Sequence, residues 1–405
     1  MSLIQSSPDY QLSTSLRARP AKESLILAKK IARERGVSRV VNTTWLDRIG
    51  VPVFASIRPD GIKGTLCVHS GKGFSAEEAE VGAYMEAIEI SFGPPGRNTA
   101  PWFMTSPEKI VSTFKGQIRF ADFAPNKGRT VSAEDSIAAV EGTEILSGLG
   151  QVMVPAELVY IPFSGVPGVR LYGTSSNGLA SGNVPDEAVV HAVAEVMERH
   201  VRSFELLDNR SCAVDIDTAP PKVRALAKRI RDVGLECHLR SSDNEFGVAY
   251  FSAYVLEPDE YDSITVAAGF GLHPISEIAA VRAIAEAVQS RLTAIHGGRD
   301  DIMKRVLLAK EIGREWELQS LRRVRDRLKQ HQQILSFERV PDFKPEVRSI
   351  ADARLCLFDA LKRAGFNHIV VVPLSDETFP FSIVRVVVPG AEMYEPEFNA
   401  LAQDF

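Results

Sequence analysis

Three segments of the chain repeat one pattern of alanine and acidic residues that fits one face of a helix. Each segment is anchored on a glutamate, with alanines three and seven residues before it and a second oxygen-bearing side chain three residues after it. Residues three apart share a helix face. The repeat therefore predicts three helices, each with a pair of oxygen ligands above small side chains where a ligand could approach. The segments are 75–89, 185–199 and 276–291; their anchors are Glu86, Glu195 and Glu286, and the second oxygen donors are Glu89, Glu198 and Gln289.

An apolar run and a glycine-bearing loop precede each of these helices. Glycine lets a backbone come close to a ligand, and a helix N-terminus offers unpaired N–H groups that suit phosphate. Ser75 with Glu78 reads as a capping box, and Pro185 falls in a first helical turn. We therefore expect three strand–loop–helix units to share one pocket, where Mg²⁺ links carboxylates to nucleotide phosphates. The runs are 65–68, 169–173 and 264–269, and the loops are 69–75, 174–183 and 270–276.

Simpler interpretations are weaker. A single pair of acids on a helix is usually solvated surface, but surface charge has no reason to keep the same offsets from alanine three times. The segment 70–73 does not match a phosphate-binding P-loop, and no Rossmann glycine fingerprint is present. The expected fold class is α/β (α+β), with mixed β-sheets flanked by helices. One domain is expected over 15–392, with terminal tails at 1–14 and 393–405.

These residues resemble the YcaO family of ATP- and Mg²⁺-using enzymes that act on peptide backbone amides. The likeness spans most of the chain: 43–60, SGKG before MEAIE, SSNGLASGN before AVAEVMERH, AIAEAVQSRL and 384–392. It implies a YcaO-like fold in which the three units form one ATP site. By motif position, it implies Mg²⁺ ligands at Glu86, Glu89, Glu195, Glu198 and Glu286, nucleotide-site residues at Asn183, Glu187 and Gln289, and phosphate-neutralising arginines at Arg199 and Arg291.

The family pattern also includes a basic residue followed by Ser or Thr on the first helix, here Arg19 and Ser24. For Arg19 and Lys22, a solvated basic helix start is an equally good interpretation. Ala180 stands where some relatives carry serine, which removes one hydroxyl contact.

The end of the chain bears on the chemistry that the resemblance implies. Many azoline-forming members end in a PxPxP tail, whereas this chain ends EPEFNALAQDF. The resemblance therefore favours ATP-dependent O-phosphorylation of a backbone amide in a ribosomally made peptide or protein, followed by thioamide formation beside a TfuA-type partner. Azoline-forming cyclodehydration with an E1-like partner is the first alternative. An accessory ATP-binding module for ribosomal-protein methylthiolation and a carboxylate–amine ligase also stay open, as does a homodimer.

The composition bears on where the protein acts and on which partners it could bind. The chain has 405 residues, a 45% hydrophobic content and a net charge of −5, which gives no general attraction to nucleic acid or an anionic membrane. No apolar run approaches the roughly 18 residues of a membrane span, and the start lacks a signal-peptide pattern. We expect a cytoplasmic protein that acts on neither nucleic acid nor membranes. Its four cysteines lack metal-site spacing and are expected to be reduced core thiols.

The remaining elements are legible in outline. Segments 25–36, 223–234 and 354–365 read as helices, and 368–372 and 381–388 as strands. Segment 300–333 is a charged helical stretch with a solvated face, or else a basic patch for an acidic leader peptide. His191 and His200 are expected to pack or cap, because no Ser or Cys motif lies beside them for activation.

Overall fold

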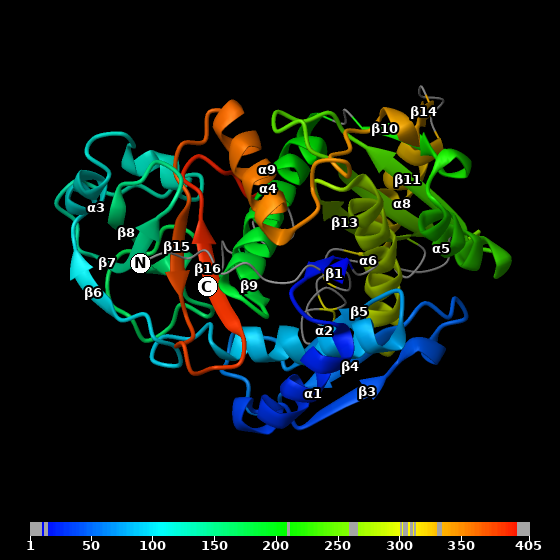
Figure 1. Cartoon of the computed structure of the whole chain (residues 1–405), viewed down its shortest axis with the longest axis horizontal. Coiled ribbons are helices and arrows are strands. Elements are labelled where there is room, and N and C mark those ends of the chain that lie inside the picture. Colours follow the sequence, from blue (N-terminus) through cyan, green and yellow to red (C-terminus); the bar gives the residue numbers. More distant parts are fainter. Residues whose placement is uncertain are drawn as a thin grey trace.

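Three β-sheets, each covered by helices, make up the main body of the computed structural model (Figure 1). The structure describes residues 10–11, 15–208, 211–258, 266–299, 302, 307, 311, 313–329 and 334–394. Within these residues, no helix is both long and apolar enough to cross a membrane. Mixed sheets flanked by helices are the predicted fold class, so that prediction is confirmed.

The N-terminal part forms a three-stranded antiparallel sheet with two helices, drawn in blue along the bottom of Figure 1. The serine at position 75 starts the second helix, because its hydroxyl accepts a hydrogen bond from the Glu78 backbone N–H at 3.2 Å. The first helix ends in a 3-10 turn closed by Gly36 in the left-handed region. The elements are β3 (Arg39–Asn42), β4 (Val53–Ile57), β5 (Val68–Lys72), α1 (Ala21–Ala32) and α2 (Ala76–Ser91); a short pair, β1 (Tyr10–Gln11) and β2 (Leu16–Arg17), precedes them.

A six-stranded antiparallel sheet lies on the left of Figure 1 and combines middle and C-terminal strands. Its order is β6-β7-β15-β16-β9, with β8 also paired to β7. Helix α4 covers β9 and β16, and α9 packs on α4. The elements are β6 (Trp102–Thr105), α3 (Pro107–Thr113), β7 (Ile137–Glu144), β8 (Gly150–Pro155), β9 (Leu179–Gly182), α4 (Pro185–Asp208), α9 (Ile350–Arg363), β15 (Val370–Pro373) and β16 (Ser382–Val387).

The third sheet has five strands in the order β13-β12-β11-β10-β14, and its last pair is parallel. Helix α6 packs against β12 and β13, and α5 packs against α6. The apolar residues between these helices and the sheet form one of the main cores. The elements are β10 (Cys212–Asp215), α5 (Pro221–Asp232), β11 (Glu236–Ser241), β12 (Tyr250–Leu256), β13 (Val266–Leu272), α6 (Ser276–His296), α8 (Arg314–Lys329) and β14 (Ile334–Ser336).

The predicted strand–loop–helix units are present, but their strands lie closer to the helices than expected. Segments 65–67 and 169–173 are not strands; all of β9, and all of β5 except Val68, lies inside the predicted glycine loops. Strand β13 likewise continues to Leu272, into the third predicted loop. Small residues fill these strands because each must lie against the helix that follows it, which hides the usual β-branched signal.

The repeated alanines do not form a floor open to a ligand, so that interpretation was wrong. All six alanines are fully buried: Ala79, Ala83, Ala188, Ala192, Ala279 and Ala283. All of them except Ala192 have backbone atoms close to glycines of the preceding strand. A Cβ on Gly71 would lie 2.0 Å from the Ala83 backbone nitrogen, and one on Gly271 would lie 2.2 Å from the Ala279 carbonyl oxygen. Glycine therefore allows strand and helix to touch, rather than backbone and ligand.

The other elements follow the prediction with small shifts at their ends. Helices α1, α5 and α9 match the segments expected at 25–36, 223–234 and 354–365, and β15 and β16 match 368–372 and 381–388. Much of 300–333 lies outside the described residues, although α8 confirms helix in part of it.

Candidate functional site

A cavity of about 410 Å³ lies where α2, α4 and α6 meet. Its walls also include the N-terminal segment before α1 and the ends of β5 and β9. Apart from Arg291, every site residue predicted from the sequence lines this cavity. They are Arg19, Ser24, Glu86, Glu89, Asn183, Glu187, Glu195, Glu198, Arg199, Glu286 and Gln289.

The three repeated units are joined in a ring, each helix reaching the strand of the next unit. Ser181 of β9 hydrogen-bonds Glu89 of α2. The backbone N–H of Leu272 in β13 donates to Glu198 of α4 at 3.1 Å. The amide of Gln289 in α6 donates to the Ser70 carbonyl of β5 at 2.5 Å. The second oxygen donor of each helix is therefore fixed by a neighbouring strand, and the ring brings all three pairs to one cavity.

Burial and mutual repulsion destabilise the charged forms of these acids. Burial raises the pKa of Glu86, and it raises the pKa of Glu89 well above its ordinary value, with the charge of Glu195 adding to the second shift. Burial also raises the pKa of Glu195 to about 7. The pKa of Glu198 is raised by burial and then by Glu286. A carboxylate cluster of this kind is stabilised by bound cations.

Several basic side chains share the cavity with the acids, among them Lys72, Arg199 and Arg282. Lys72 at the end of β5 forms an ion pair with Glu286 at 2.6 Å. Desolvation alone would raise the pKa of Glu286, but Lys72, with Arg199 and Arg282, more than offsets it and lowers that pKa. The sequence prediction included Arg199 but missed Lys72 and Arg282. Arg282 could have been found, because it lies one helical turn before Glu286 and so shares its face.

The donor set fits Mg²⁺ shared with a phosphate ligand better than a metal held by protein alone. Among the described residues, no three His, Cys, Asp or Glu side chains are grouped so that they could hold a metal ion. Mg²⁺ typically binds one or two carboxylates and takes its other oxygens from water and substrate phosphates. The spread of the five carboxylates around the cavity suits that arrangement.

Glu187 acts as the anchor of the N-terminal segment. It is 2% exposed and accepts hydrogen bonds from the Arg17 side chain and the Ala18 backbone N–H, both at 2.8 Å. The Asn183 amide donates to both of its oxygens at 3.1 Å, and the Ser24 hydroxyl donates to Asn183 at 2.7 Å. Two residues predicted to shape the nucleotide site thus hold a third one, Ser24, against the cavity.

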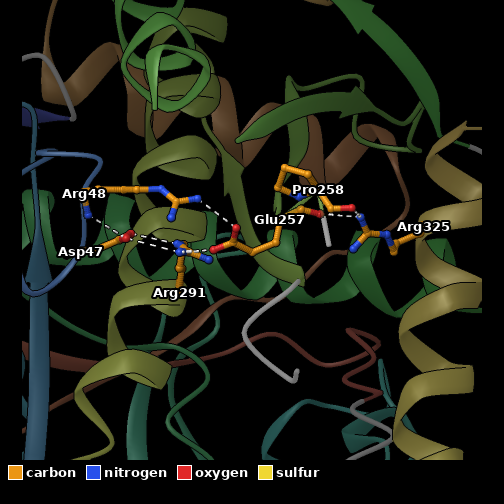
Figure 2. Close-up of polar contacts among 6 residues, drawn as sticks. All are labelled: Asp47, Arg48, Glu257, Pro258, Arg291 and Arg325. Atoms are coloured by element: carbon orange, nitrogen blue, oxygen red, sulfur yellow. Dashed lines mark hydrogen bonds and ion pairs between the residues drawn. The ribbon is translucent and has the colours of Figure 1, made fainter. Parts of the chain in front are cut away.

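Arg291 does not line the cavity, contrary to its expected role at phosphate. It is 4% exposed and pairs with Asp47 at 2.9 Å and Glu257 at 2.5 Å, as Figure 2 shows. Arg48 pairs with the other oxygen of Glu257 at 3.0 Å. Arg291 lies five residues after Glu286, about 140° around the helix, which turns it away from the carboxylate face. Its ion pair with Asp47 joins α6 to the segment before β4.

Comparison with known proteins gives a consistent assignment. A family-wide model described as "YcaO cyclodehydratase, ATP- and Mg²⁺-binding" matches residues 70–392. An uncharacterised protein of Methanothermobacter thermautotrophicus is 30% identical over 374 residues, which cover 89% of this chain and 92% of that protein. An uncharacterised protein in the tfuA 3′ region of Rhizobium leguminosarum bv. trifolii is 32% identical over 89% of this chain and 85% of its own length.

Solved structures share the fold. A YcaO protein from Methanopyrus kandleri bound with AMPPCP and Mg²⁺ superposes with a TM-score of 0.73 at 22% identity, covering 95% of each chain. A heterocyclase in complex with substrate and cofactor gives a TM-score of 0.71 at 18% identity, covering 93% of this chain and 53% of the other.

Proposed function

Because the chain belongs to the YcaO family, whose cofactors are ATP and Mg²⁺, we propose that it phosphorylates a backbone amide oxygen of a ribosomally made peptide or protein. We further propose that the activated amide becomes a thioamide beside a TfuA-type partner. The observation that carries the first proposal is the convergence of the five glutamates predicted to bind Mg²⁺ on one cavity that Lys72, Arg199 and Arg282 also line. The relative from the tfuA 3′ region supports the second.

The chain's own residues would act mainly by positioning and charge compensation. Glu86, Glu89, Glu195, Glu198 and Glu286 would hold Mg²⁺, which neutralises the transferring phosphoryl group when bound. The basic side chains Lys72, Arg199 and Arg282 would neutralise the remaining phosphate oxygens. Arg282 takes the place that the sequence assigned to Arg291.

Phosphoryl transfer needs only ATP and the amide, and the later replacement of oxygen by sulfur needs a sulfide donor. The amide oxygen forms a bond to the terminal phosphorus as the bond to the bridging oxygen breaks, releasing ADP. A sulfide donor then adds to the amide carbon, and phosphate leaves with the original oxygen. Preorganised charge is the main contribution expected of a protein in such a transfer.

Titration calorimetry tests the nucleotide site directly. Wild-type protein should bind ATP only with Mg²⁺, and the Arg282→Gln variant should lose most of that affinity while its circular dichroism spectrum stays native. The Glu86→Gln and Glu198→Gln double variant should lose it as well. ATP binding of equal strength without Mg²⁺ would contradict the proposed carboxylate bridge.

Mass spectrometry separates the two reaction outcomes. With ATP, sulfide, partner protein and candidate peptide, the proposal requires a mass gain equal to exchange of oxygen for sulfur. Loss of one water without sulfide would instead indicate azoline formation, which the family description as cyclodehydratase favours. No change in any peptide would favour an accessory role.

A further inference from the structure

His191 lies inside the cavity, although the sequence suggested only packing or capping. It is on α4, four residues after Glu187 and four before Glu195, so all three share one helix face. In the repeat it stands four residues before the anchor glutamate. Arg282 stands at the same position on α6, and Gly82 on α2. These three equivalent positions form one layer of the cavity. The layer has two polar side chains and one position without a side chain.

The contact between His191 and Arg282 fixes where the imidazole carries its proton. The Arg282 guanidinium nitrogen lies 3.2 Å from Nε2 of His191. A guanidinium can only donate hydrogen bonds, so Nε2 must be the acceptor. Burial, followed by the nearby charges of Arg282, Arg17 and Lys72, holds the pKa of His191 well below its ordinary value, which keeps the ring neutral. The single proton of the neutral ring is then on Nδ1.

That Nδ1–H group has no partner among the described residues. The Ser181 backbone is close enough to act as a weak acceptor that slightly raises the pKa of the ring, but Nδ1 is buried and no described residue lies in hydrogen-bonding geometry to it. Within the described part of the chain, the Nε of Arg282 is buried without a partner as well. A buried donor left unsatisfied costs about 1–3 kcal/mol, so such groups in a cavity indicate a missing acceptor.

We propose that His191 donates its Nδ1–H to an oxygen of the bound nucleotide's phosphate chain while its Nε2 holds Arg282 in place. The inference rests on the proposed ATP site. The acceptor is assigned to phosphate because the same layer contains Arg282, and because Lys72 and Arg199 line the same cavity. A phosphate chain offers oxygens to all of these donors, and hydrogen bonds to a charged acceptor are the stronger kind.

The tautomer can be measured before any nucleotide is added. With ¹⁵N-labelled histidine, NMR of the nucleotide-free protein should show one ring protonated at Nδ1, and that signal should vanish in the His191→Asn variant. The chain has eight histidines, so the spectrum stays tractable. A His191 ring protonated at Nε2, or at both nitrogens, would overturn the inference whatever the protein binds.

Two substitutions separate the roles of the ring nitrogens. Asparagine places its amide near the position of Nδ1, whereas glutamine reaches the position of Nε2. His191→Gln should keep an acceptor for Arg282 but lose the donor to phosphate, so it should weaken binding of MgATP by about tenfold to a hundredfold. His191→Asn should weaken binding less. Both variants should show the same thermal unfolding as wild type.

Inorganic triphosphate with Mg²⁺ is the second probe, because it has no base or ribose. The loss in His191→Gln should be of similar size for triphosphate and for MgATP. Wild-type affinity in His191→Gln, or a larger loss in His191→Asn, would refute the hydrogen bond from His191 to phosphate. Neither result would contradict the proposed ATP site. If wild-type protein does not bind MgATP, the proposed function itself fails, and the donation fails with it.

Discussion

Replacing Gly71 with alanine tests how closely the cavity depends on contact between strand and helix. The added Cβ would lie 2.0 Å from the Ala83 backbone nitrogen and 2.2 Å from the Ala79 carbonyl oxygen. Ordinary contact begins near 3.4 Å, so β5 and α2 would have to separate by more than 1 Å. Both neighbours are backbone atoms, and no side-chain rotation can relieve the overlap.

The expected cost has two parts. Overpacking of a rigid interior typically costs about 1–3 kcal/mol, and the rigid neighbours here put Gly71→Ala near the upper end. The same separation would carry Glu86 and Glu89 away from the other two helices. A misplacement of about 1 Å can reduce catalysis by roughly a hundredfold, so turnover should fall by about that factor even at temperatures where the variant is folded.

Gly82→Ala is the matched control, because Gly82 lies on the helix side of the same contact. Its Cβ would be 3.4 Å from the Gly71 Cα, which is ordinary contact. Alanine inside a helix is favoured over glycine by about 0.5–1 kcal/mol, so this variant should be equally or more stable. Urea unfolding followed by circular dichroism measures both. Equal midpoints for Gly71→Ala and wild type, or an equal loss in Gly82→Ala, would refute the argument.

Three further outcomes are expected. Arg199→Lys should lose most ATP-dependent turnover, because a point charge cannot replace a bidentate fork; near wild-type turnover would make Arg199 structural. Arg291→Gln should lower the free energy of unfolding by about 3–5 kcal/mol, since Asp47 is left buried without its partner, while calorimetry on the folded variant should give unchanged MgATP affinity. In metal-free protein, burial raises the pKa of Glu195 from 4.5 to about 7, so the folded state binds a proton that the unfolded state releases. The free energy of unfolding should therefore fall as pH rises from about 4.5 to 7, and urea titrations should show a shallower fall in Glu195→Gln.

The carboxylate helices could be predicted because their signal is local. Glu86, Glu195 and Glu286 keep fixed offsets from alanine, and a helix converts such offsets directly into a shared face. The packing role of the alanines could not be predicted in the same way. Their contacts are with strand glycines such as Gly71, and that pairing depends on a packing distance that no spacing expresses.

Basic residues were harder to assign than the acidic pairs. Arg291 was placed at phosphate by its motif, yet its neighbours Asp47 and Glu257 come from distant segments and bind it elsewhere. Lys72 lies at the end of a strand that resembled a loop, so its approach to Glu286 could not be foreseen. The single domain expected over 15–392 stays a prediction.

The N-terminal contacts of the cavity affect how a shortened form of this protein should be cloned. The family match begins at residue 70, but β4, the strand paired with β5, precedes it, as does β3, which pairs with β4. Ser24 and Arg17, which hold Asn183 and Glu187, also lie before that boundary. A fragment expressed from residue 70 would retain all five predicted metal-binding glutamates, yet it would expose one edge of β5 and open one wall of the pocket. Its failure to bind nucleotide would then report a missing wall rather than a missing ligand.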